Sequence, residues 1–152
     1  KERVLSIGAD RFIDYKTEDY TQTVSDVDYV LDTLGGVETE KQMSIMKKGG
    51  HLVSLRAMPN GDFAKEMNLP KWKQFLFGLA GRKFDKMAQK YGVHYHFIFV
   101  RSNGAQLQEV ADIFTKLEIK PSIDTVFTFD EVNAALDKVA NGRSRGKTVL
   151  KF

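Results

Sequence analysis

Short apolar segments alternate with helix-like ones over the first 55 residues, and this alternation constrains the fold more than any other feature. The strand candidates are RFIDY (11–15), VDYVLDTL (27–34) and HLVSL (51–55), which are rich in β-branched or bulky residues. Between them lie TEDYTQTVSD, which Thr17 is placed to cap, and VETEKQMSIMKKGG, whose lysines and glycines are typical of a helix C-terminus. Short connections between such segments favour right-handed crossovers, so the sequence predicts an α/β fold with a parallel sheet.

The pattern changes after residue 55. Residues 56–92 form a long irregular stretch with one or two helices, and a strongly β-prone strand follows at 93–100. NGAQLQEVADIFTKLEI is predicted to be a helix with one apolar face. The tail then contains a strand at 123–129, an amphipathic helix capped by Asp130, and a final strand, GKTVLKF.

The chain opens on KERVLSIGA, which is typical of the last turns of a helix that closes at Gly8. Proteins seldom begin in mid-helix, and the first residue is not Met. We therefore expect a fragment of a longer protein.

Composition excludes several kinds of site. The chain has no cysteine, which excludes disulfides and thiolate zinc sites, and no serine lies in a Gly-x-Ser-x-Gly elbow. No apolar run approaches the roughly 20 residues that a membrane helix needs. A net charge of +3 is too mild to indicate nucleic-acid binding. We expect a cytoplasmic protein that binds neither nucleic acid nor membrane.

The corner that ends the second strand candidate, DTLGG, is a candidate ligand site. Ligands of parallel α/β sheets bind at the carboxyl ends of the strands, where Thr33 can offer a hydroxyl and Gly35 permits close approach of a ligand to the backbone. An Asx-type turn that caps the next helix is the alternative, and the stretch alone favours it. Gly-x-Gly-x-x-Gly, the usual phosphate-binding spacing, occurs nowhere in the chain. The ends of the neighbouring strands, including Ser54 and Leu55, would complete a shelf for a cofactor.

Three further groups of residues each have two interpretations. His94 and His96 share one face of a strand and could bind a metal, but surface or partly packed histidines are favoured, so no metal site is predicted. The stretch 71–84 mixes basic and apolar residues and could lie on a membrane or a partner, or form a lid or an oligomer contact, although the buried face of a helix is favoured. The basic loop with Arg143 could bind phosphate or be a solvated turn.

Several stretches together indicate a family. LSIGADRFIDYKTEDY, DYVLDTLGG, MKKGGHLVSL and GRSRGKTVLKF occur in an order and spacing that resemble the C-terminal portion of medium-chain dehydrogenases/reductases, in the NADPH-dependent quinone and enone reductase branch. The resemblance covers essentially the whole chain and is firmest over 5–55 and 93–152.

The resemblance implies a fold and a domain division. Residues 1–120 would be the C-terminal part of a Rossmann-like nucleotide-binding domain, with an incomplete parallel sheet and flanking helices. Its glycine-rich loop would lie upstream of residue 1. Residues 121–152 would return to a chaperonin-10-like catalytic domain as strand, helix and strand.

The resemblance also implies cofactor contacts. Tyr15 and Arg143 match positions beside the adenosine 2′-phosphate of NADP(H), and Thr33 matches the hydroxyl residue near the cofactor ribose. The segment near the nicotinamide is matched by Leu55, Phe97, Ile98 and Phe99. No residue of the chain matches a catalytic acid, base or nucleophile.

The function that follows from the resemblance is hydride transfer from NADPH to a quinone or an α,β-unsaturated carbonyl compound by a parent enzyme, expected to be a homodimer. The fragment itself should be inactive. The alternative is a non-catalytic binding module that dimerises through exposed edges of its incomplete sheet.

Overall fold

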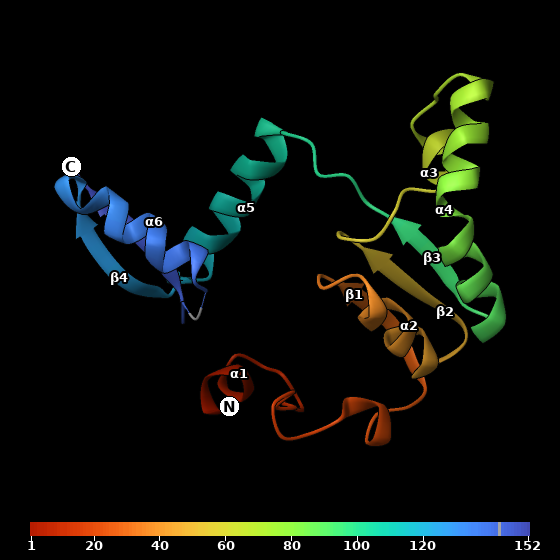
Figure 1. Cartoon of the computed structure of the whole chain (residues 1–152). Helices are drawn as coiled ribbons and strands as arrows, with labels where there is room; N and C mark the ends of the chain where they lie inside the picture. Colours follow the sequence, from red (N-terminus) through yellow and green to blue (C-terminus); the bar gives the residue numbers. More distant parts are fainter. Residues whose placement is uncertain (143) are drawn as a thin grey trace. The chain divides into compact units, whose positions relative to one another are not determined.

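The computed structural model describes residues 1–142 and 144–152. It divides into two compact units, Lys1–Val100 and Arg101–Phe152, which carry the parallel sheets and flanking helices that the sequence predicts (Figure 1). In chain order the first unit contains α1 (Glu2–Ser6), the 3₁₀ helix η1 (Tyr20–Gln22), β1 (Val27–Asp32), α2 (Val37–Ser44), β2 (Met46–Ser54), α3 (Gly61–Glu66), α4 (Lys71–Tyr91) and β3 (His94–Phe97).

The sheet of the first unit is parallel, with the strand order β1-β2-β3. Asp32 pairs with Ser54, and Ser54 pairs with Phe97, so the three strands end side by side. Because all three run in one direction, their carboxyl ends form a single edge of the sheet.

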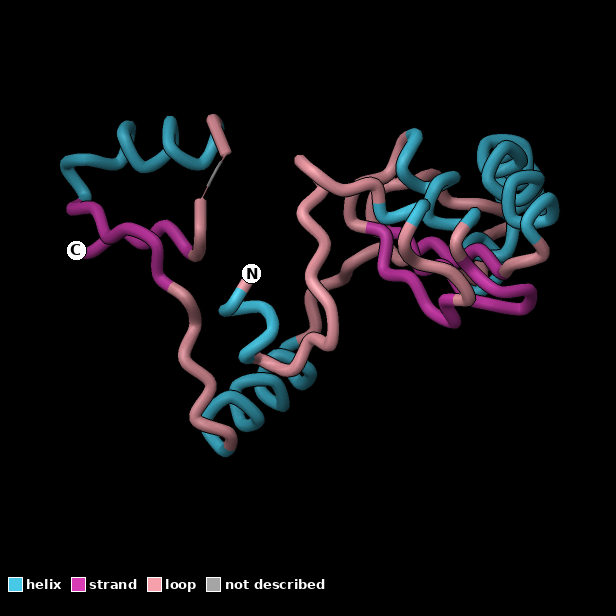
Figure 2. Tube along the Cα trace, turned by 90° about the horizontal axis from the view of Figure 1, so that it is seen from below, coloured by secondary structure: helices cyan, strands magenta, loops and turns pink. Residues whose placement is uncertain are grey.

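The core of this unit lies on one face of the sheet. Leu52 of β2 and Tyr95 of β3 pack with Met43 of α2 and with Met87 of α4. Figure 2 shows the helices on one side of the strands. Successive strand residues point to opposite faces, and on the other face Leu31 is 65% exposed. The unit therefore covers one face of its sheet.

The second unit is built around a strand-helix-strand motif, as predicted. Its elements are α5 (Gly104–Lys116), β4 (Ile123–Thr128), the 3₁₀ helix η2 (Phe129–Glu131), α6 (Val132–Ala140) and β5 (Lys147–Lys151), and β4 pairs in parallel with β5. Asp130 is not the cap of α6. It lies inside η2, which Thr128 caps through a reciprocal capping box with Glu131. The domain boundary expected at 120/121 falls inside this unit and stays a prediction.

The strand predicted at 11–15 is wrong. Asp14 folds the chain back on itself there: its carboxylate accepts the N–H of Lys16 at 3.0 Å, and its carbonyl accepts the N–H groups of Thr17 and Glu18. These local bonds compete with an extended conformation. The helix expected to follow is only η1, and Asp19 caps it instead of Thr17.

The helix predicted at 37–50 is too long. It ends at Ser44, and Lys47 and Lys48 belong to β2, which begins at Met46 with an irregular register opposite β1. Gly49 lies at φ 82° and donates its N–H to the carbonyl of Gly92 at 2.7 Å. The local sequence could not predict this contact, because Gly92 follows α4 and is distant from Gly49 in the chain.

Helix α4 carries two interior glycines whose surroundings differ. A Cβ on Gly81 would lie 2.4 Å from the Asn60 Cβ, because the chain before α3 packs directly on this glycine. A Cβ on Gly78 would meet nothing within 4 Å. Only Gly81 is therefore required by packing.

We predict that alanine at these two positions changes the free energy of unfolding in opposite directions. Gly81→Ala should destabilise the chain by about 1–3 kcal/mol, because the Asn60 backbone must move. Gly78→Ala should stabilise it by about 0.5–1 kcal/mol, since alanine restricts the unfolded chain and favours the helix. Urea unfolding followed by circular dichroism measures both, and equal effects would contradict the packing described.

Candidate functional site

The carboxyl ends of β1, β2 and β3 form the candidate site. Backbone hydrogen bonds tie each turn to the neighbouring strand: the Leu55 N–H donates to the Asp32 carbonyl at 2.9 Å, and the Ile98 N–H donates to the Ser54 carbonyl at 3.0 Å. Parallel α/β sheets bind their ligands at this edge. The chain therefore presents three connected strand ends where a cofactor is expected.

The buried carboxylate of Asp32 organises this edge. One oxygen accepts the backbone N–H groups of Leu34 at 3.0 Å and Gly35 at 2.8 Å. The other accepts the hydroxyls of Thr39 at 2.8 Å and Ser54 at 2.9 Å. Asp32 is fully buried, and its four donors come from the corner, α2 and β2. It joins three consecutive elements at one point.

Asp32 is ionised within the protein. Burial opposes the charged form, but the hydrogen bonds from Gly35, Thr39, Ser54 and Leu34 favour it and lower the pKa of the carboxyl below its ordinary value. All four contacts are donated to the carboxylate, which suits the ionised form because that form only accepts hydrogen bonds. At neutral pH Asp32 is therefore a fixed negative charge that holds donors, and it has no proton to give.

Ser54 extends the network into the turn after β2. Its hydroxyl donates to Asp32 and accepts the N–H of Ala57 at 2.9 Å and that of Arg56 at 3.3 Å. Ser54 is fully buried. Of the predicted site residues, it has the clearest structural role, which is to orient the turn that carries Leu55.

Gly35 is required by the protein's own packing. It lies at φ 71°, and a Cβ there would be 2.9 Å from the Arg56 Cβ and 3.1 Å from the Arg56 carbonyl oxygen. The space beside Gly35 is thus filled by the turn after β2. Gly36, at φ 63°, has open space around it and is the N-cap of α2. A ligand contact at Gly35 stays a prediction.

Most of the remaining predicted residues gather at this edge. Thr33 is exposed at the corner after β1, and Leu55 is 37% exposed after β2. After β3, Ile98 and Phe99 are 47% and 63% exposed. Phe97 is half-buried with its ring against Phe63, 5.2 Å between centroids. The edge thus offers one hydroxyl and several apolar side chains.

The Asx-type turn proposed for the corner is present, since the Asp32 side chain accepts the N–H of Leu34 two residues on. It does not cap α2, whose N-cap is Gly36 without a side-chain cap. The sequence did not identify Asp32 and Thr39 as site residues. The available signal was an acidic residue at the end of an apolar strand with hydroxyl residues nearby. Ser54, however, is 22 residues from Asp32, and their contact depends on the register between β1 and β2.

Tyr15 lies in a different part of the first unit. It is exposed and lines a cavity of about 700 Å³. Leu34, from the corner, belongs to the same lining, so the cavity adjoins the candidate site. The lining residues are Tyr15, Glu18, Asp19, Tyr20, Leu34, Glu38 and Lys41.

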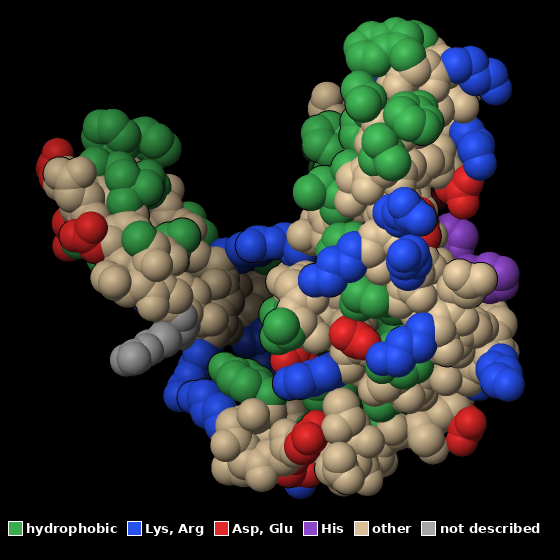
Figure 3. Space-filling model, turned by 45° about the vertical axis from the view of Figure 1, so that its right-hand side comes forward, with side chains coloured by type: hydrophobic (Ala, Val, Ile, Leu, Met, Phe, Trp, Pro, Cys, Tyr) green, Lys and Arg blue, Asp and Glu red, His purple; other side chains and the backbone are tan. Residues whose placement is uncertain are grey.

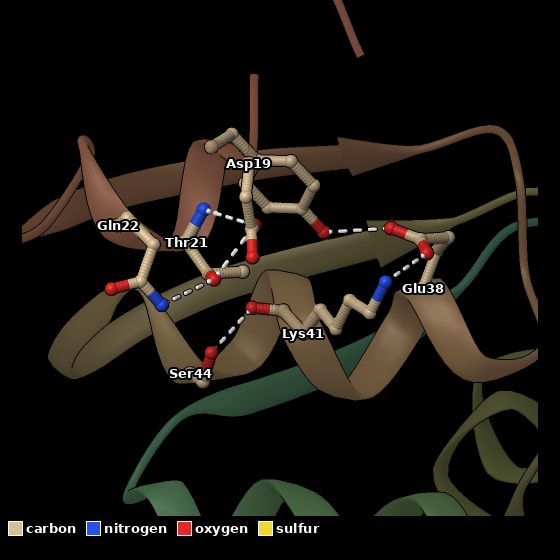
Figure 4. A network of polar contacts seen from close by, with 7 residues as sticks. Asp19, Thr21, Gln22, Glu38, Lys41 and Ser44 are labelled. Carbon is tan, nitrogen blue, oxygen red and sulfur yellow. Dashed lines mark hydrogen bonds and ion pairs between the residues drawn. The ribbon is translucent and has the colours of Figure 1, made fainter. Parts of the chain in front are cut away.

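The charges of this cavity oppose a phosphate. Glu38 accepts hydrogen bonds from Lys41 at 2.8 Å and from the Tyr20 hydroxyl at 2.9 Å, and these bonds lower the pKa of its carboxyl (Figure 4). Thr21 donates to Asp19 and lowers the pKa of that carboxyl too. The lining therefore has three acids against Lys41, which already pairs with Glu38. Arg143, the other predicted phosphate contact, lies outside the described residues.

The three histidines form a cluster that the sequence only partly predicted. His51 Nδ1 lies 2.9 Å from His96 Nε2, and the His51 ring stacks on His94 with centroids 4.7 Å apart. The cluster lies on the face of the sheet opposite the core, and Tyr29 stacks on it from β1. Within the described residues, no group of three or more His, Cys, Asp or Glu is arranged to hold a metal ion.

Comparisons with known proteins agree on one family. The model of the family described as zinc-binding dehydrogenase matches residues 7–150. The mitochondrial NAD(P)H oxidoreductase RTN4IP1 of Danio rerio is 32% identical over 155 residues, which cover 98% of this chain and 39% of the relative. The 2-methylene-furan-3-one reductase of Solanum lycopersicum is 28% identical over 153 residues, which cover 98% of this chain and 30% of the reductase.

The fold recurs in solved structures. The quinone oxidoreductase from Coxiella burnetii matches with a TM-score of 0.73 at 20% identity, over 99% of this chain and 41% of that one. At this identity the match shows a common fold. The chain spans about two fifths of the length of the oxidoreductases from Danio rerio and Coxiella burnetii.

We predict that Asp32→Asn lowers the free energy of unfolding by about 2 kcal/mol at neutral pH, because the charge-assisted hydrogen bonds are lost. The lowered pKa means that this stabilisation is fully present above the unfolded-state pKa of about 3.9 and is lost as the pH falls through the folded-state value. The difference between the two proteins should therefore narrow below about pH 4. Urea unfolding over a pH series measures it.

Asp28→Asn is the matched control on the same strand. Its carboxylate is 54% exposed and pairs with Lys47, so the expected change is within about 1 kcal/mol. A difference for Asp32→Asn that is absent at neutral pH, or constant down to pH 2, would show that Asp32 does not act as an ionised acceptor.

Proposed function

Since this chain belongs to the zinc-binding dehydrogenase family of oxidoreductases, we propose that its strand-end edge binds the nicotinamide half of NADP(H) for hydride transfer to a quinone or an α,β-unsaturated carbonyl compound. The resemblance to the C-terminal portion of medium-chain dehydrogenases/reductases is thus confirmed. The observation that carries the proposal is the Asp32 network, which holds the ends of β1 and β2 together beside β3.

The cofactor supplies the hydride from nicotinamide C4 when bound. The chain's residues bind and orient it. The exposed hydroxyl of Thr33 is proposed to hydrogen-bond a ribose, and Leu55 and Ile98 are proposed to lie against the nicotinamide ring. Asp32 keeps these positions fixed without taking part in proton transfer. No residue of the chain is proposed as a catalytic acid or nucleophile.

The acceptor is proposed to be a small conjugated carbonyl compound or a quinone. Support comes from the resemblance to the quinone and enone reductase branch. The similar protein from Solanum lycopersicum is named as a reductase of a methylene-furanone. Apolar side chains at the edge suit a planar, weakly polar acceptor.

The choice of NADPH over NADH is the finer part of the proposal. It rests on the resemblance at Tyr15 and Arg143. The acidic lining of the Tyr15 cavity disfavours a second phosphate there, so a preference for NADPH requires cationic groups beyond the lining residues. Comparing the dissociation constants for NADPH and NADH in titrations of the protein measures this preference.

Domain division, assembly and location complete the proposal. Residues 1–120 are assigned to the nucleotide-binding domain and 121–152 to the catalytic domain.

Self-association is proposed to occur along β1, because β1 is an outer strand of its sheet, with Tyr29 and Leu31 exposed. A cytoplasmic location is still proposed, although the similar protein from Danio rerio is named as mitochondrial.

We predict that the 152-residue chain alone binds NADPH weakly and catalyses no hydride transfer. A glycine-rich loop normally supplies the N–H groups and helix dipole that hold the pyrophosphate, and the chain has no Gly-x-Gly-x-x-Gly. Fluorescence titration with NADPH measures the affinity. A micromolar dissociation constant would contradict this prediction.

We predict that Thr33→Val weakens cofactor use in the longest natural form of the protein that contains this chain. Loss of one hydrogen bond to a ribose should raise KM for NADPH about 5- to 10-fold with a smaller effect on kcat. NADPH oxidation with a quinone acceptor measures both constants. Thr115→Val on α5 is the control and should leave KM unchanged; an unchanged KM for Thr33→Val would remove Thr33 from the site.

A further inference from the structure

Helix α4 exposes a stripe of large apolar side chains that we expected, from the sequence, to be buried. Trp72, Phe75, Leu76 and Leu79, here called the apolar stripe, are each between 52% and 67% exposed. At 100° per residue they fall within about 100° of the helix circumference, so they form one surface. The expectation that this is the buried face of the helix is wrong.

The buried face of α4 lies elsewhere. Gly81 packs on Asn60, and Met87 and Ala88 belong to the core cluster with the sheet. Phe77 contacts Phe63 of α3, with centroids 5.9 Å apart. The apolar stripe takes no part in this packing.

Basic side chains surround the apolar stripe. The same helix face continues with Arg82, Lys83 and Lys86, here called the basic patch, and all three are exposed. Among the described carboxylates none lies within salt-bridge distance of these three. Lys71 and Lys73 border the stripe, and the Lys73 ammonium lies 5.3 Å from the centre of the Trp72 ring.

The apolar stripe itself carries no acidic side chain, and next to the basic patch Glu40 of α2 interacts electrostatically with Lys83. Residues 71–84 contain no Asp or Glu. The first acid, Asp85, points to the opposite side of the helix, where it accepts a hydrogen bond from Asn60 at 2.6 Å. Figure 3 shows hydrophobic side chains at the upper end of the α3–α4 projection, with Lys and Arg following below.

We propose that this face of α4 docks on the surface of an anionic lipid bilayer. Aromatic and aliphatic side chains flanked by lysine and arginine are the composition of helices that bind membrane interfaces, and tryptophan prefers the headgroup level. The basic patch complements anionic headgroups. The indole N–H is the only side-chain hydrogen-bond donor of the apolar stripe. The face therefore suits a fluid lipid surface better than a partner protein that would be recognised by specific polar contacts.

The proposal is tested with vesicles and the chain's own fluorescence. Trp72 is the only tryptophan, so intrinsic emission reports directly on the apolar stripe. The expected result is a blue shift and co-sedimentation with vesicles of phosphatidylcholine mixed with phosphatidylserine. Binding should be much weaker to phosphatidylcholine alone and should decrease with added salt.

Two variants test the two parts of the surface. Leu76→Glu should weaken partitioning at least about 10-fold, since one apolar anchor is replaced by a charge. Neutralising Lys83 and Lys86 in a double Gln variant should weaken it about 5-fold per lysine. Leu136→Glu on α6 and Lys116→Gln on α5 are the matched exposed controls and should bind as the unchanged chain does.

Three outcomes would overturn the proposal. One is no emission shift and no sedimentation with anionic vesicles. Another is equal binding to neutral vesicles, unaffected by the lysine substitutions. The third is a blue shift without vesicles that depends on protein concentration and disappears in Leu76→Glu, which would assign the stripe to a second copy of the chain. Circular dichroism confirms that each variant is folded.

Discussion

A single buried charge determines the geometry of the strand-end edge. Asp32 lies at the end of β1, and its four hydrogen bonds reach the corner, the first turn of α2 and the end of β2. A carboxylate in this position is stable only while its donors are in place, and the donors are oriented only while the carboxylate is charged. The corner and the neighbouring turn are therefore one cooperative element rather than two loops.

In the structure, the residues that make the corner rigid differ from the residue that it exposes. Gly35 and Ser54 are occupied by the protein's own contacts, with Arg56 and Asp32 respectively, whereas Thr33 remains exposed. The interior of the corner thus gives rigidity, and its outer surface stays exposed. The adjoining Tyr15 cavity is lined by three acids and one lysine, a charge balance that opposes a bound phosphate.

The sequence predicted the parallel sheet and the strand-helix-strand tail because periodicity and propensity act locally. The region 11–15 has strand-like composition, but Asp14 offers local hydrogen bonds that a composition count ignores. The Asp32–Ser54 and His51–His96 contacts depend on the register between strands, which adjacent residues do not encode. The stripe on α4 has ordinary amphipathic spacing, and only the packing of Gly81 shows which face is buried.

The projecting helix and the strand-end edge are mechanically linked within the first unit. The Phe63 ring contacts Phe77 of α4 at 5.9 Å and Phe97 at the end of β3 at 5.2 Å, both edge to face. Aromatic contacts of this kind fix orientation as well as burying area. A surface that holds α4 therefore also orients the edge where the cofactor is proposed to bind. Docking of α4 on a bilayer, as proposed above, would thus also fix the orientation of this edge relative to the bilayer.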